Sequence, residues 1–123
     1  MIAGIVTPEQ EAVIHLRVRG REDREEEIEV IIDTGFNGFL TLPASLIARL
    51  GLASGPQVPT KLADGGHVQM QVYQATVVWD QEDRDVTVLE AGSSPLAGMA
   101  LLAGYDIRIQ VVDGGSVTIE ALN

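Results

Sequence analysis

Residues 30–42 read Val-Ile-Ile-Asp-Thr-Gly-Phe-Asn-Gly-Phe-Leu-Thr-Leu, an Asp-Thr-Gly tripeptide between two apolar runs. The first run ends a stretch with the two-residue period of a half-buried strand. The sequence therefore predicts that Asp33 lies on a tight loop directly after a buried strand. The simplest interpretation is an ordinary turn, because Asp caps turns and Gly adopts positive φ. The functional interpretation is a carboxylate held in place for acid–base chemistry.

A second element lies well downstream, where residues 96–102 read Leu-Ala-Gly-Met-Ala-Leu-Leu. Two apolar residues and a glycine precede a segment that we expect to form a short helix, residues 99–103. The two elements together, in this order and at this separation, resemble the retropepsin-like (retroviral-type) aspartic peptidases. The resemblance covers about residues 13–122. It implies a mainly β fold, a retropepsin-like acid-protease β-barrel with one or two short helices and a single lobe per protomer.

The resemblance assigns a role to each residue of the Asp33 loop. It implies that Asp33 is the catalytic aspartate, that the Thr34 hydroxyl locks neighbouring loops across a dimer, and that Gly35 permits the tight backbone. Asn37 falls where the family braces this loop. Phe36 replaces the small residue that is usual in retroviral enzymes, and we expect it to narrow the cleft or to line a substrate pocket.

The resemblance also implies a flap that closes over substrate, where glycines allow hinge motion. The residues that match the flap are Ala63, Asp64, Gly65 and Gly66. An ordinary hairpin turn is the alternative for this segment. The residues that match a loop beneath the active site are Leu96, Ala97 and Gly98. Met99 stands where those enzymes commonly have an arginine, so we expect one charge contact between subunits to be missing.

The chain contains one Asp-Thr-Gly tripeptide in 123 residues, a length that makes one domain. Pepsin-like enzymes carry two such loops in a chain more than twice as long. We therefore expect residues 1–123 to form a single retropepsin-like domain, and a homodimer to supply the second aspartate. The resemblance implies water-mediated hydrolysis of peptide bonds in extended polypeptide, with no metal or organic cofactor.

Alternating apolar and polar residues predict a first hairpin over residues 13–32. The alternation places one set of side chains inside and the other outside. We expect Arg17 and Arg19 on the outer face to lie across from Glu27 and Glu29.

The rest of the chain reads as short elements separated by turn signals. A helix is expected over residues 42–51 and a hairpin over residues 58–79, with a bulge or bend near Val72 where the apolar face changes parity. A turn is expected at residues 81–84. A terminal hairpin is expected over residues 105–121.

The composition excludes several classes of function. With a net charge of −10 the chain has no basic stripe for phosphates, so we expect no nucleic-acid partner. Two histidines and no cysteine argue against a zinc site. The lack of cysteine fits the cytoplasm, and the lack of a basic leader or long apolar run predicts neither a signal peptide nor a membrane span. The expected partners are a second copy and a peptide or protein substrate.

Two other functions fit the same sequence. A dimeric module on the same fold would hold a peptide or protein without catalysis, because a fold does not determine a function. A monomeric β domain would use its acidic surface for interaction, and it would show no concentration-dependent association.

Overall fold

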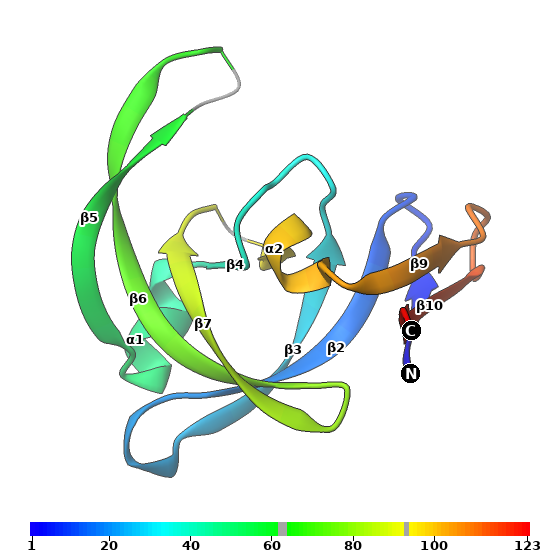
Figure 1. Ribbon diagram of the computed structural model, residues 1–123, viewed down its shortest axis with the longest axis horizontal. Coiled ribbons are helices and arrows are strands. Elements are labelled where there is room, and N and C mark those ends of the chain that lie inside the picture. The colour runs from blue at the N-terminus through cyan, green and yellow to red at the C-terminus, as the bar shows by residue number, and fades with distance from the viewer. Residues whose placement is uncertain (62–63, 93) are drawn as a thin grey trace.

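The computed structural model describes residues 1–61, 64–92 and 94–123. Within these residues the chain is mainly β, with short helices between strands (Figure 1). The strands are β1 (Ile2–Val6), β2 (Ala12–Arg19), β3 (Glu25–Ile32), β4 (Leu40–Leu42), β5 (Ala53–Lys61), β6 (His67–Trp79), β7 (Glu82–Glu90), β8 (Leu96–Ala97), β9 (Tyr105–Ile109) and β10 (Ser116–Ala121). The helices are α1 (Ala44–Leu50), α2 (Met99–Leu102) and the 3₁₀ turn η1 (Arg21–Asp23). The predicted fold class is confirmed.

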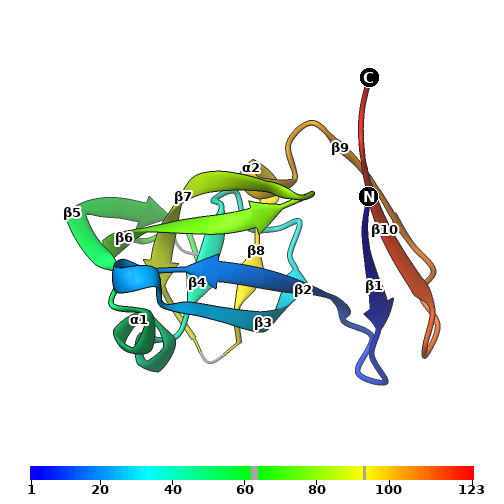
Figure 2. The same ribbon diagram turned by 90° about the horizontal axis from the view of Figure 1, so that it is seen from below.

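The strands form one sheet that closes on itself. Its order is β5-β6-β7-β4-β8-β3-β2-β1-β10-β9, and β6 also pairs with β2. That extra pairing joins Val18 to Val77 and closes the run from β6 to β2 into a barrel. The β5 strand lies outside the barrel beside β6, and β1, β10 and β9 form a separate wing beside β2 (Figure 2).

The barrel interior is aliphatic because successive strand residues point to opposite faces. In β2, Ile14, Leu16 and Val18 are at most 2% exposed, and the intervening His15 and Arg17 are exposed. The other strands contribute further buried residues to the same cluster, among them Val30, Leu40, Leu42, Val77, Val86 and Val88. Burial of this apolar surface is the main source of stability for the barrel.

The predicted helix is confirmed as α1, but it is shorter than the expected residues 42–51 because Leu42 belongs to β4. Pro43 precedes the helix with an extended backbone, and Gly51 ends it in the left-handed conformation at φ 61°. The Gly51 N–H donates to the Ala48 carbonyl oxygen at 3.1 Å. Leu46, Ile47 and Leu50 are buried and pack the helix against the barrel.

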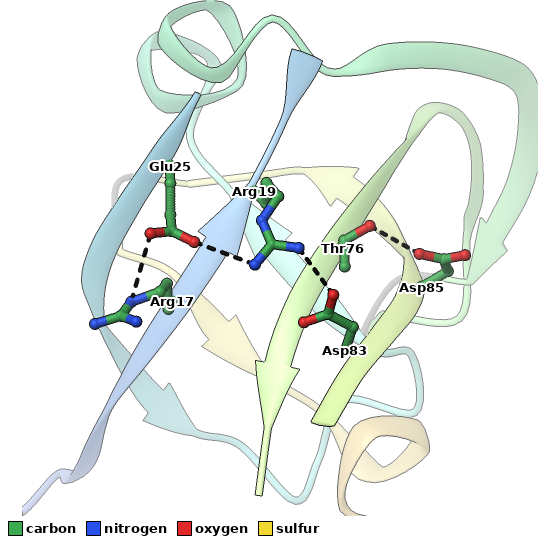
Figure 3. Close-up of polar contacts among 6 residues, drawn as sticks. All are labelled: Arg17, Arg19, Glu25, Thr76, Asp83 and Asp85. Carbon is green, nitrogen blue, oxygen red and sulfur yellow. Dashed lines mark hydrogen bonds and ion pairs between the residues drawn. The ribbon is translucent and has the colours of Figure 1, made fainter. Parts of the chain in front are cut away.

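The first hairpin is confirmed, but one of its predicted cross-strand pairs is wrong. Arg17 lies opposite Glu27 as expected, whereas Arg19 lies opposite Glu25. The reason is that η1 turns the chain earlier than expected, so β3 already begins at Glu25. Arg19 consequently bridges Glu25, at 3.4 Å, and Asp83 of β7, at 2.9 Å (Figure 3).

The second hairpin consists of β5 and β6, and β6 runs without a break through the predicted bend. The buried side of β6 still changes, from Val72 to Ala75 and Val77. The irregularity lies on the partner strand, where the register shifts between Ser54 and Gln57 directly across from this part of β6. The predicted irregularity is therefore a bulge in β5 opposite the point where the buried side of β6 changes.

The turn predicted at residues 81–84 is wrong in its bounds, because the observed turn lies earlier in the chain. The β7 strand already begins at Glu82, and the chain reverses at Asp80 and Gln81, which have φ of 50° and 71°. Neither residue is a glycine, so the usual sequence signal for a tight hairpin turn is absent here.

The terminal hairpin of β9 and β10 is confirmed, and a strand that the sequence analysis did not predict pairs with it. The unpredicted strand is β1, which pairs with β10 on one side and with the start of β2 on the other. The chain ends therefore lie in one sheet (Figure 2). No helix in the described part of the chain has the length and apolar character needed to cross a membrane.

Candidate active site

Asp33 follows the last residue of β3, at the point where β3 runs parallel to β8. Ile31 and Ile32 pair with Leu96 and Ala97 in this short parallel ladder. The ladder continues for one more bond, because the Asp33 N–H donates to the Ala97 carbonyl oxygen at 2.9 Å. The sheet therefore holds the Asp33 backbone, and the residue as a whole is half-buried.

The loop after Asp33 is closed by its own hydrogen bonds. The Gly35 N–H donates to Asp33 Oδ1 at 3.0 Å, and the Phe36 N–H donates to the Asp33 carbonyl oxygen at 3.2 Å. A Cβ at position 35 would lie 3.3 Å from Asp33 Oδ1, so glycine gives the carboxylate the room to turn back onto this N–H. One carboxylate oxygen is therefore fixed by the loop.

Gly98 holds this loop from the other side. Its N–H donates to the Phe39 carbonyl oxygen at 3.0 Å. The first N–H groups of α2 follow, since Met99 donates to the Phe36 carbonyl oxygen at 2.7 Å and Ala100 donates to that of Gly38 at 3.1 Å. A Cβ at position 98 would overlap the carbonyl oxygens of Gly38 and Phe36. The structure thus brings residues 96–98 against the Asp33 loop, and this approach requires a glycine.

Phe36 lies within this arrangement. Its ring rests against the Cα atoms of Gly38 and Gly98, where a Cβ at either position would meet ring carbons. The side chain is half-buried. One part of the Phe36 ring therefore packs against Gly98, and the rest of the ring is accessible to solvent beside the Asp33 loop.

Thr41 is a site-positioning residue that the sequence analysis did not identify. It is 4% exposed, and its Oγ1 accepts a hydrogen bond from the Leu96 N–H at 3.1 Å. The bond ties β4 to β8 next to the Asp33 ladder. The available signal was a hydroxyl residue between Leu40 and Leu42 in a strand that is otherwise fully apolar.

Arg84 was also missed, and it supports the far end of α2. Its guanidinium donates to the carbonyl oxygens of Leu101, at 2.9 Å, and Ala100, at 3.3 Å. The same group lies 5.4 Å from the centroid of the Phe39 ring, within range of a cation–π interaction. An arginine in the middle of β7 gives no sequence signal for this role, because the contact depends on how β7 and α2 are placed.

Three of the predicted flap residues, Asp64, Gly65 and Gly66, lie at the tip of the β5–β6 hairpin, which projects from the barrel in Figure 1. Asp64 Oδ1 accepts a hydrogen bond from the Gly66 N–H at 2.8 Å, and Gly65 has φ 90°. All three residues are exposed. Ala63, the fourth predicted flap residue, lies outside the described residues.

A cavity of about 400 Å³ lies between the base of this hairpin and the barrel. Its walls are mainly apolar, with Pro56 and Val72 on the hairpin side and Phe39 and Leu89 on the barrel side. Gly38 also lines it, so the cavity is continuous with the loop that follows Asp33. It has the size and character of a pocket for an apolar side chain.

Thr34 and Asn37 are exposed on the Asp33 loop. No hydrogen bond from either side chain to a described residue is present, so the brace expected from Asn37 is not formed within this chain. Met99 is 44% exposed at the start of α2. The groups expected to meet a second copy are thus at the surface.

Comparisons with known proteins show which solved structures this chain is similar to. No protein-family model matches the chain, and no curated protein matches it in sequence. Among solved structures it is similar to the EIAV protease complexed with the inhibitor HBY-793, with a TM-score of 0.59, 16% identity, and 77% of this chain and 88% of that chain covered. It is also similar to a retropepsin-like aspartic protease from Rickettsia conorii, with a TM-score of 0.61, 19% identity, and 99% and 91% covered. The chain therefore has a retropepsin-like fold.

Proposed function

From this retropepsin-like fold, we propose that the chain is an aspartic endopeptidase that acts as a homodimer, with one Asp33 from each copy. The observation that carries the proposal is the bracing of the Asp33 loop. The loop is bonded to itself through Gly35 and to Ala97 and Gly98 across the sheet. A carboxylate held this firmly by backbone is preorganised for chemistry rather than free to relax.

In the proposed mechanism, two Asp33 carboxyl groups share one proton, because two close carboxylates cannot both be ionised. The ionised group takes a proton from a bound water, and the water oxygen forms a bond to the scissile carbonyl carbon. The protonated group donates its proton to the carbonyl oxygen, giving a neutral gem-diol intermediate. Collapse of the intermediate breaks the C–N bond, with proton transfer to the leaving amine and no covalent enzyme adduct.

The substrate in this proposal is an extended polypeptide. A peptide that lies between the β5–β6 hairpin and the Asp33 loop would pair with backbone groups as an added strand. The cavity lined by Phe39, Val72 and Leu89 supports a preference for an apolar side chain at one position. Asp64, Gly65 and Gly66 would close over the bound chain, and the Thr34 hydroxyl would bond across the dimer.

We further propose that residues 1–123 act as one domain in the cytoplasm. The continuous sheet supports the first point, since both chain ends pair within it. The lack of cysteine is consistent with a reducing compartment.

A second candidate is a dimeric module that binds peptide without cleaving it. Met99 favours it, because the family resemblance implies an arginine at this position and a charge contact between subunits. Loss of that contact would weaken the alignment of two Asp33 groups without changing the fold.

Cleavage of a mixed peptide library, detected by mass spectrometry from acidic to neutral pH, tests the proposal. Wild type and Asp33→Asn are compared at high protein concentration, with sedimentation showing that both associate equally. The peptidase predicts products from wild type alone. If a confirmed wild-type dimer yields no Asp33-dependent products but retains library peptides, the binding module is correct.

A further inference from the structure

The peptide unit that joins Asn37 to Gly38 lies in the middle of the braced loop and is not itself braced. The Phe36 carbonyl oxygen accepts the Met99 N–H at 2.7 Å, and the Gly38 carbonyl oxygen accepts the Ala100 N–H at 3.1 Å. Between these two bonds, neither the Asn37 carbonyl nor the Gly38 N–H makes a hydrogen bond to a described residue. Both residues lie outside helices and strands. The loop is thus held on either side of a peptide unit that is free.

The Asn37 side chain is free as well. The residue is exposed, and its amide makes no hydrogen bond to a described residue. The next residue, Gly38, has no Cβ to shield its backbone nitrogen. An asparagine in this setting can react with its own chain, because attack of the Gly38 nitrogen on Asn37 Cγ closes an unstrained succinimide ring.

We propose that Asn37 is a modification site, where spontaneous deamidation releases the brace of the Asp33 loop. The Gly38 nitrogen gives up its proton and bonds to Asn37 Cγ. The Cγ–Nδ2 bond breaks, and the side-chain nitrogen leaves as ammonia with the equivalent of that proton. Water then opens the ring. Attack of water at Cγ gives aspartate, and attack at the backbone carbonyl gives isoaspartate, whose main chain runs through Cβ and Cγ.

Both products change the loop that holds Asp33. Each of them adds a negative charge to this loop. Isoaspartate also adds one atom to the main chain between the carbonyls of Phe36 and Gly38. These carbonyls then no longer match the spacing of the Met99 and Ala100 N–H groups that bind them. We therefore expect the isoaspartyl chain to lose part of the contact between the loop and α2.

Two Asp-Gly pairs elsewhere in the chain can form the same ring, and the structure holds both of them. Asp64 Oδ1 accepts the Gly66 N–H at 2.8 Å, which fixes this side chain. The N–H that follows Asp113 donates to the Val6 carbonyl oxygen at 3.0 Å, so its nitrogen is engaged. A carboxylate also resists nucleophilic attack more than an amide does, because it is negatively charged. Asn37 is consequently the position that we expect to react first.

The chemical step stands on the loop geometry alone, whereas its effect on catalysis rests on the proposed function. The brace that the reaction releases is the one that supports the proposed role of Asp33. Deamidation therefore limits how long a copy of the chain stays active.

Ageing of the purified chain at mildly alkaline pH tests the proposal, because base removes the Gly38 proton. Trypsin places the three candidate positions in different peptides, residues 25–49, 62–84 and 109–123. Mass spectrometry with fragmentation that distinguishes isoaspartate from aspartate follows each peptide over time. We expect Asn37 to convert first. Asn37→Gln should stay unmodified over the same period, because its longer side chain closes a larger ring far more slowly.

The effect on the loop is measured on separated fractions. Anion exchange isolates the deamidated chain through its added negative charge. The isoaspartyl fraction should unfold at a lower urea concentration than unaged wild type, and it should lose Asp33-dependent cleavage. Asn37→Asp supplies the charge without the longer main chain, so its urea midpoint should lie above that of the isoaspartyl fraction. Cleavage by each protein is compared with that of its own unaged sample.

The outcomes separate this proposal from the peptidase. An Asn37 that stays intact while a synthetic peptide of residues 34–41 deamidates overturns the proposal, and so does earlier modification of Asp64 or Asp113. An isoaspartyl fraction with an unchanged urea midpoint overturns the release of the brace. If unaged wild type shows no Asp33-dependent cleavage, the peptidase is rejected, and the peptide map and the urea midpoint still decide this proposal.

Discussion

At the scale of single residues, the candidate site depends on two positions where a few atoms decide the geometry. Gly98 lets the backbone of residues 36–38 approach β8, and the Thr41 hydroxyl accepts a hydrogen bond from the partly buried Leu96 N–H beside it. Neither residue carries the proposed chemistry. Both determine where the Asp33 carboxylate lies.

Gly98→Ala should destabilise the fold by about 1 to 3 kcal/mol, because the new methyl group meets two backbone oxygens that cannot move independently. Urea unfolding measures the change. Gly66→Ala is the matched control, since its Cβ would meet only the flexible Asp64 carboxylate, and its effect should stay below about 0.5 kcal/mol. Equal losses for both variants would contradict the close approach at Gly98.

Thr41→Val should cost about 1 kcal/mol in the free energy of unfolding, because it removes the acceptor of the partly buried Leu96 N–H. Thr41→Ser keeps the hydroxyl and should retain most of the stability. The Asp33-dependent cleavage rate of the folded variants gives the second measurement. If valine were as stable as wild type, the hydroxyl would have no positioning role.

At the scale of elements, the ion pairs on the outer faces connect strands that the sheet already aligns. Arg49 of α1 donates two hydrogen bonds to the Glu26 carboxylate of β3, both at 3.0 Å. The hydrogen bond from Arg49 lowers the pKa of Glu26 below its ordinary value of 4.5. The contact therefore helps to hold α1, a short helix that packs against the barrel through only a few residues.

Glu26→Gln should lower the stability at neutral pH by less than about 1 kcal/mol, since the pair is partly exposed. The folded-state pKa of Glu26 is depressed, so its contribution is present above the unfolded-state pKa and disappears as the pH falls through the folded-state pKa. Wild type and variant should therefore converge in acid. Urea titrations at several pH values check this, and a difference that grows in acid would reverse the assigned sign.

At the scale of the whole molecule, one copy of the chain contains only half of the proposed active site. Each copy provides one Asp33 loop and one β5–β6 hairpin, and the wing of β1, β10 and β9 lies on the other side of the barrel strands from β5 (Figure 2). Association and catalysis should consequently be linked by mass action.

Adding a tenfold excess of Asp33→Asn to wild type should reduce cleavage by about tenfold, because random pairing leaves few wild-type homodimers. The same excess of an unrelated protein that is not cleaved is the control, since it cannot pair with wild type and should not inhibit. Product formation by mass spectrometry gives the rate. Undiminished cleavage in the presence of the excess would show that one chain suffices.

Local sequence patterns accounted for most elements but not for how they are paired. The two-residue period predicted β2, β3, β9 and β10, and Pro43 and Gly51 marked the ends of α1 correctly. The Arg19 pairing and the turn before β7 were wrong, because a register depends on turns that carry no glycine signal, at Glu22 and at Asp80. The β1 strand was missed because its role comes from pairing with β10, far away in the chain.

By itself the sequence determined that Asp33 follows a strand, that a glycine element lies downstream, and that the chain is mainly β. These follow from local periodicity and backbone preference, which each segment carries alone. Only the tertiary structure decided that Gly98 locks the Asp33 loop, that Thr41 and Arg84 support it, and that β9 is an edge strand of the sheet. Those facts depend on which distant segments become neighbours, and packing of the whole barrel sets that choice.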